Sequence, residues 1–152
     1  MDLSEFLLAR IAEDWETARA SAEKNGPTWS TAELSGGTRV NGSVDGGNPR
    51  SYSGDYELWD DEGALGMFEE TATHVVRWHP ARVLAECEAR RRIVEEARAA
   101  AEEHKRAAWA APVVATLGRA LRQGEDQAWW QALCLLALPY ADHPDYREEW
   151  RP

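Results

Sequence analysis

The sequence predicts a mainly α-helical protein with a small antiparallel β-hairpin or sheet, folded as a single-domain helical bundle over residues 1–152. Three observations favour this class. The chain has 152 residues, the size of one ordinary domain. It contains 25 alanines, and alanine has the highest helix propensity. Apolar residues recur at helical spacing on both sides of residues 28–62, which instead carry glycines and short alternating runs.

The first predicted element is an amphipathic helix, Leu3–Asn25, within residues 1–25. Its apolar stripe recurs at spacings of three and four: Leu3, Leu7, Ile11, Trp15, Ala18 and Ala22. Asp2 and Glu5 fit a capping box, in which each side chain accepts from the other's backbone amide. Gly26 permits a left-handed cap, and Pro27 cannot continue the helix, so the helix is expected to end there.

Residues 28–62 are predicted to form a small sheet with a glycine-rich excursion. Thr28–Thr31 is typical of a short strand, and Tyr56–Trp59 alternates polar and apolar residues like another. Between them, Asn41-Gly42 carries the signal of a tight hairpin turn. We therefore expect two or three antiparallel strands here.

Residues 63–138 are predicted to be helical. One helix should stop near Trp78, because the residue before a proline is pushed out of helical geometry. Pro80 suits the first position of the next helix, which is expected to reach about Ala108. Its inward residues are Val83, Leu84, Cys87, Val94, Ala97 and Ala101, and Trp15 and Trp78 are also expected in the core.

Gly124 predicts a break in the helical region that follows. We expect one helix over 112–122 and a last helix over 126–138, which Pro139 stops. Residues 139–152 then form a polar tail.

Charge and composition exclude several classes of function. The net charge is −10, from 17 basic and 27 acidic residues, which argues against binding nucleic acid through phosphate attraction. All of this excess lies in residues 1–70. Two cysteines cannot form a disulfide framework, and no apolar run is long enough to span a membrane, so a cytoplasmic protein is expected. Phosphate-binding glycine loops and zinc-protease or serine-hydrolase motifs are missing, which predicts no cofactor and no enzyme activity.

Aromatic and acidic residues near the C-terminus are the candidate partner-binding residues. Adjacent helical residues face about 100° apart, so one of the two tryptophans at 129–130 is expected to be exposed. The tail concentrates carboxylates, an imidazole and aromatic rings, which would suit docking on a partner. The favoured interpretation is structural: Pro144 and the aspartates shape a turn, and the aromatic rings pin the tail to the body. The candidates are Trp129, Trp130, Tyr140, Asp142, His143, Asp145, Tyr146 and Trp150.

A metal site has weaker support. Glu70 and His74 stand four apart on one helical face, and imidazole and carboxylate suit zinc, manganese or iron. A real site needs three or four converging ligands, so a solvated helical face is the favoured interpretation. The arginines at 90–92 are interleaved with glutamates, and we expect a solvated, ion-paired face there also.

Two blocks of sequence resemble one known family. They are WHPARVLAE with ARRRI over residues 78–93, and LALPYADHPDYREEW over residues 136–150. The second is similar to the C-terminus of an uncharacterised domain family, of unknown function, of Streptomyces-type actinobacteria and their phages. His79 stands where that family is expected to have aspartate, and residues 107–132 are lengthened. The resemblance implies a mobile-element setting and transfers no catalytic residue.

Three hypotheses of function remain. The first is a non-enzymatic accessory protein that binds an unidentified protein partner, with a homo-oligomer through Trp129–Trp130 left open. The second is an anti-defence or DNA-mimic inhibitor, whose carboxylates would need to lie in rows on one face. The third is a metal-dependent hydrolase using Glu70 and His74 with Asp142, His143 and Asp145. Direct binding to nucleic acid or membrane is not expected.

Overall fold

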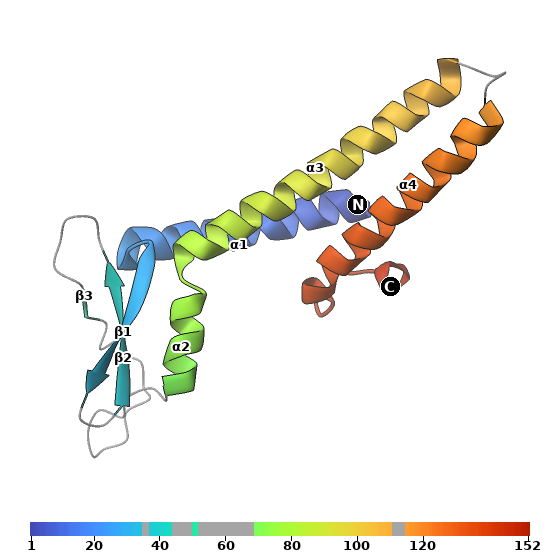
Figure 1. Cartoon of the computed structure of the whole chain (residues 1–152). Helices are drawn as coiled ribbons and strands as arrows, with labels where there is room; N and C mark the ends of the chain where they lie inside the picture. Colours follow the sequence, from blue (N-terminus) through green and yellow to red (C-terminus); the bar gives the residue numbers. More distant parts are fainter. Residues whose placement is uncertain (35–36, 44–49, 52–68, 111–114) are drawn as a thin grey trace. The chain divides into compact units, whose positions relative to one another are not determined.

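The chain is mainly helical with one small antiparallel sheet among the described residues, as the sequence predicts (Figure 1). The computed structural model describes residues 1–34, 37–43, 50–51, 69–110 and 115–152. The elements in chain order are α1 (Leu3–Asn25), β1 (Thr28–Leu34), β2 (Gly37–Ser43), β3 (Arg50–Ser51), α2 (Glu69–Arg77), α3 (Pro80–Ala110) and α4 (Ala115–Ala137), then two 3₁₀ turns, η1 (Leu138–Tyr140) and η2 (Glu148–Trp150).

Two compact units make up the chain. We call them the terminal unit, Met1–Glu13 with Cys87–Pro152, and the central unit, Asp14–Glu86. The boundaries between the units fall within the residue ranges of α1 and α3. The single domain over 1–152 stays a prediction.

Both ends of α1 are confirmed. The backbone N–H of Asp2 donates to the Glu5 carboxylate at 2.8 Å, and the N–H of Glu5 donates to the Asp2 carboxylate at the same distance. This is the reciprocal capping box that the spacing predicts. Gly26 follows the helix with φ of 81°, a conformation in which a side chain is strained. Local sequence therefore defines both ends of this helix.

The sheet of the central unit has the order β1-β2-β3, with both pairs antiparallel. Leu34, the last residue of β1, pairs with Gly37, the first residue of β2, so Asn41-Gly42 is not the turn between these two strands. The hairpin predicted at Asn41-Gly42 is wrong: Gly42 lies inside β2, paired with Trp29 on one side and Arg50 on the other. The third strand predicted at Tyr56–Trp59 lies outside the described residues.

In the central unit α2 packs against β1 and β2, and α3 begins directly after it. The predicted stop near Trp78 and the predicted start at Pro80 are both confirmed. The Nδ1 of His79 lies 3.3 Å from the backbone nitrogen of Arg82 and 3.2 Å from the carbonyl oxygen of Pro27, so His79 caps α3 in the tautomer that leaves Nδ1 without a proton. The Pro27 carbonyl accepts from the Ala81 N–H at 2.8 Å, which satisfies another free amide of the first turn. Histidine thus fills the capping role expected of aspartate.

The terminal unit has an apolar core drawn from α1, α3, α4 and the tail. Its buried residues are Leu3, Phe6, Leu7, Ile11, Cys87, Val94, Ala97, Leu133, Cys134, Ala137 and Trp150. Ala101, predicted to face inward, is exposed. Periodicity identifies the apolar face of α3, but it does not say how far along the helix a neighbour covers that face.

Trp15 and Trp78 are not core residues, contrary to prediction, since each is 39% exposed. In both cases an arginine lies over the ring. The guanidinium carbon of Arg82 is 4.4 Å from the centroid of Trp78, and that of Arg19 is 5.7 Å from Trp15. Cation–π contacts of this kind stabilise a half-exposed ring at a surface.

One helix, α4, replaces the two helices predicted over 112–122 and 126–138. Gly124 lies within it, and Gly26 is the one glycine with positive φ in the described part of the chain. Gly124 therefore has no left-handed cap geometry. Glycine in a helix costs about 1 kcal/mol relative to alanine, which a helix of this length tolerates. The helix ends at Ala137, close to the stop predicted from Pro139.

Candidate protein-interaction surface

The C-terminal tail is fastened to α1 by an aromatic cluster around Phe6. The rings of Tyr140 and Tyr146 lie edge-on to Phe6, with centroids 6.3 and 6.1 Å away. Trp150 packs against Phe6 at 5.0 Å, and both side chains are buried. Such pairs contribute about 0.5–1.5 kcal/mol each beyond the area that they bury. The rings of Tyr140, Tyr146 and Trp150 therefore hold the tail to α1, as the structural interpretation of the tail predicts.

His143 is held between Arg10 and its own turn. A guanidinium nitrogen of Arg10 contacts Nε2 of His143, and the backbone N–H of Asp145 donates to Nδ1 at 3.1 Å. Arg10 also pairs with Glu13 at 2.7 Å and lies 5.6 Å from the centroid of Phe6. The Arg10 side chain is only 11% exposed. His143 thus joins the tail to α1, while the Asp145 side chain stays exposed.

Both donors and acceptors surround His143, and the Asp145 carboxylate lies 4.0 Å from its Nδ1. A neutral imidazole accepts at one ring nitrogen, whereas an N–H donor faces each nitrogen of His143. The Arg10 Nε and the Tyr146 hydroxyl are buried with no partner among the described residues. Sequence reasoning missed Phe6 and Arg10, because Arg10 and His143 lie 133 positions apart and no local pattern links them.

The second half of α4 exposes large apolar side chains. Trp130 is 47% exposed and Trp129 is half-buried, so one of the pair faces solvent, as predicted. Leu135 is 57% exposed, and Leu138, in η1, is 39% exposed. Sequence reasoning did not select these two leucines. Leu135 lies about 140° around the helix from Trp130, so these exposed apolar side chains are spread over about half of the circumference of α4.

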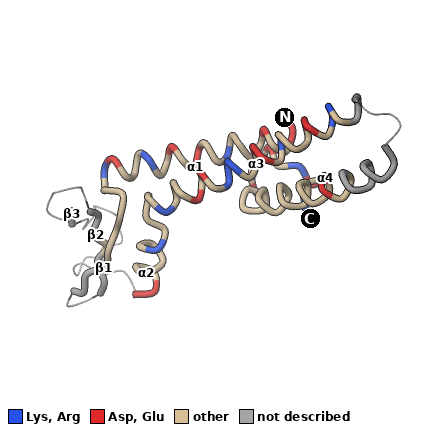
Figure 2. The backbone as a smooth tube through the Cα atoms, turned by 45° about the horizontal axis from the view of Figure 1, so that its top comes forward, with Lys and Arg blue, Asp and Glu red and all other residues tan. Residues whose placement is uncertain are grey.

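No charged residue occurs from Gln127 to Ala141, although charged residues make up 29% of the chain. This uncharged run covers the second half of α4, η1 and the residue that follows, and Figure 2 draws that half of α4 without a charged residue. Exposed side chains in the run include Gln127, Ala128, Trp130, Gln131, Leu135, Leu138 and Pro139. We call these seven residues the neutral face. The missing charge is visible in the sequence and could have identified the surface.

Glu70 and His74, the weak metal candidates, are both exposed on α2 in the central unit. Their four-residue spacing is helical, as predicted. Within the described ranges, no three His, Cys, Asp or Glu side chains are grouped so that they could hold a metal ion. The described helices also include none with the length and apolar character needed to cross a membrane.

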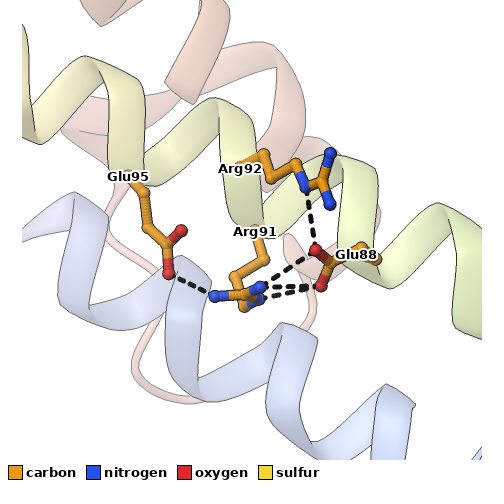
Figure 3. A network of polar contacts seen from close by, with 4 residues as sticks. All are labelled: Glu88, Arg91, Arg92 and Glu95. Carbon is orange, nitrogen blue, oxygen red and sulfur yellow. Dashed lines mark hydrogen bonds and ion pairs between the residues drawn. The ribbon is translucent and has the colours of Figure 1, made fainter.

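The arginines at 90–92 form part of an ion-paired face on α3, as predicted (Figure 3). Arg91 contacts Glu88 at 2.8 Å and Glu95 at 2.5 Å, and Arg92 contacts Glu88 at 2.8 Å. Hydrogen bonds from Arg91 and Arg92 lower the pKa of the Glu88 carboxyl. These guanidinium groups are therefore partly neutralised by carboxylates of the same helix, which disfavours a phosphate-binding role.

A histidine that the sequence did not single out joins α3 to α4. Nδ1 of His104 lies 2.6 Å from the Asp126 carboxylate, and Nε2 lies 3.2 Å from that of Glu125. Carboxylates accept hydrogen bonds and do not donate, so both contacts are strongest when the ring carries two protons. The pair of contacts positions the first half of α4, just before the neutral face begins.

The fold and this surface define a small, mainly helical protein with an anchored tail and an uncharged helix face. The chain belongs to a family of unknown function, DUF6221, whose model matches residues 1–152. Neither a curated protein nor a solved structure matches the chain.

Proposed function

We propose that this chain is a non-enzymatic, acidic accessory protein of an actinobacterial phage or mobile element, which acts in the cytoplasm by docking on another protein. The observation that carries this proposal is the neutral face: a helix surface with exposed Trp130, Leu135 and Leu138 and no charge, in a chain of net charge −10. The phage or mobile-element setting rests on the resemblance of the two sequence blocks described above.

The composition of the neutral face is that of an interface core. Interface cores are depleted of charged residues, because charge is costly to remove from water, and they are enriched in aromatic residues. Burying apolar area contributes roughly 25 cal/mol per Å², so covering three large side chains favours association. Tryptophan is also a frequent binding hot spot, which makes Trp130 the expected anchor.

Three of the four histidines, His79, His104 and His143, make structural contacts, which favours a non-catalytic role for them. A general base needs a free nitrogen within hydrogen-bond reach of a substrate proton. His104 and His143 each have both ring nitrogens in contact with protein groups, and the Nδ1 of His79 faces the first turn of α3. These side chains fasten elements together.

DNA mimicry has less support from α1, because its carboxylates do not form an uninterrupted row. Arg19 contacts both Glu16 and Glu23, and Arg10 contacts Glu13. Phosphate-like rows would need carboxylates without such neutralisation.

Quantitative pull-down from an actinobacterial host tests the docking proposal. Leu135→Glu puts a charge into the neutral face at an exposed position, and Ala20→Glu adds the same charge at an exposed position of α1. We expect a captured protein to be lost with Leu135→Glu and kept with Ala20→Glu, while circular dichroism and thermal melting show both variants folded. Capture that survives Leu135→Glu unchanged would contradict docking through this face.

A further inference from the structure

Three backbone segments of the central unit meet at His79. This residue lies between α2, which ends at Arg77, and α3, which begins at Pro80. Pro27, which follows α1 in the chain, belongs to the same corner, because its carbonyl accepts from the Ala81 N–H at 2.8 Å. His79 is half-buried, so protons from solvent can still reach it.

One ring atom of His79, Nδ1, faces two backbone groups with opposite requirements. It lies 3.3 Å from the Arg82 nitrogen, which donates, and 3.2 Å from the Pro27 carbonyl oxygen, which accepts. A ring nitrogen without a proton accepts a hydrogen bond, and one with a proton donates, so Nδ1 can pair with only one of these groups at a time. The proton on Nδ1 therefore decides which contact forms.

We propose that His79 is a proton-dependent switch at the corner between α2 and α3. While Nδ1 has no proton, it accepts from the Arg82 N–H and caps α3. When the ring takes up a second proton, Nδ1 donates to the Pro27 carbonyl, and its contact with Arg82 is lost. Histidine changes charge between about pH 5 and 8, so acidification across this range moves one hydrogen bond from α3 to Pro27.

Neither state of the switch leaves a backbone group at the corner without a partner. The Arg82 N–H also lies 3.0 Å from the carbonyl oxygen of His79, which it keeps as an acceptor when Nδ1 becomes a donor. The Pro27 carbonyl keeps the Ala81 N–H when Nδ1 caps α3, and its two lone pairs allow it to accept both donors in the other state. Because an unpaired backbone group is costly, these second partners make the exchange possible.

The protonated ring adds a positive charge to this corner. The positive end of the α3 dipole opposes that charge, whereas the Pro27 carbonyl accepts a charge-assisted hydrogen bond from it. Arg82, the nearest cation on α3, is paired with Glu86 at 2.9 Å and packs over the Trp78 ring. Each charge state of His79 thus has one favourable contact of its own. The nearest other ionisable residues along the elements that meet here are Lys24 of α1, Glu33 of β1, and His74 and Arg77 of α2.

An NMR titration of the full, isotope-labelled chain from about pH 8 to about pH 5 tests the switch. The nitrogen-15 shift of Nδ1 reports whether this atom carries a proton, and the Arg82 amide proton reports the capping contact. We expect Nδ1 of His79 to be unprotonated at the start of the titration. The Arg82 amide resonance should then move upfield as the pH falls, because the amide loses one of its acceptors. The matched control is His74→Gln, which removes the neighbouring histidine and should leave this titration unchanged.

His79→Asp separates the switch from general effects of pH. An aspartate remains ionised and accepts hydrogen bonds across this pH range, so the pH dependence of the Arg82 amide should be lost. His79→Asn, whose side-chain oxygen also accepts without titrating, replaces this variant if it does not fold. A proton on Nδ1 already at about pH 8 would overturn the proposal, because Pro27 would then be its partner throughout. An Arg82 resonance that stays fixed in the wild type, or moves equally in the variant, would overturn it too.

Discussion

Gly124→Ala is a direct test of whether α4 is one continuous helix. Gly124 lies in the interior of the helix, is exposed, and has no positive φ. A Cβ atom added at this position meets nothing within 4 Å. Alanine therefore fits here without a steric cost, and it limits the freedom of the unfolded chain more than glycine does.

The expected gain follows from helix propensity alone, because no contact is added or lost. Alanine is more favourable than glycine in a helix interior by about 0.8–1.0 kcal/mol. In a chain of this size, about 1 kcal/mol corresponds to a melting temperature higher by about 2–4 °C. If Gly124 were instead the left-handed cap between two helices, alanine would be strained there by about 1–2 kcal/mol, and the sign would reverse.

Urea and thermal unfolding of the purified variant, followed by circular dichroism, measure this difference. We expect a higher urea midpoint at an unchanged slope, since the surface exposed on unfolding is the same. Gly26→Ala is the matched control: φ there is 81°, so the same substitution should destabilise by about 1 kcal/mol. A lower melting temperature for Gly124→Ala would refute a continuous α4 and restore the break that the sequence suggested.

Four further substitutions or reactions probe other parts of the chain. Trp150→Ala removes a buried side chain of the tail and should lower the free energy of unfolding, measured in urea, by about 3–5 kcal/mol. A decrease below about 1 kcal/mol would mean that the tail adds little to the core. Asp2→Ala removes half of the capping box and should cost about 1 kcal/mol, most of which Asp2→Asn should recover; equal melting of the two variants would argue against capping. His104→Leu removes both contacts between α3 and α4, so the urea midpoint should fall by about 1 kcal/mol, and an unchanged midpoint would deny their contribution. Burial raises the pKa of the Cys134 thiol, so maleimide should label this thiol slowly until urea is added. The free energy of unfolding should fall as the pH rises past the ordinary pKa range of a thiol, because the thiol of the unfolded chain ionises first. Rapid labelling of the folded chain would contradict this prediction.

Local chemistry made much of the fold predictable. Reciprocal capping by Asp2 and Glu5, followed by Gly26-Pro27, defines α1 from residues that touch one another along the chain. Pro80 likewise determines where α3 begins. These signals succeed because each depends on backbone groups within one turn.

Glycine signals failed where neighbouring structure overrode a local preference. Gly42 is compatible with a tight turn, but pairing on both sides retains it inside β2. Gly124 weakens α4 by too little to end it. Both errors have one cause: glycine permits a turn without requiring one.

The candidate surface was predictable only in part. Exposure of one of the paired tryptophans follows from helix geometry, and the uncharged run can be read directly from residues 127–141. The sequence also suggested that the rings of the tail, Trp150 among them, pin it to the body, but it could not identify their partner Phe6, which lies near the other end of the chain. Long-range pairing of this kind leaves no mark on either local sequence.

The packing of the tail against Phe6 has a consequence for the synthesis of the protein. Arg10 and His143 are 133 positions apart, and Trp150 comes later still, so the ribosome makes nearly the whole chain before the terminal unit can close. Until then the apolar side of α1 has no tail to cover it. A stalled ribosome or a truncated mRNA would release a polypeptide in which the apolar surface of this helix is exposed to solvent. Chaperones and proteases recognise such surfaces.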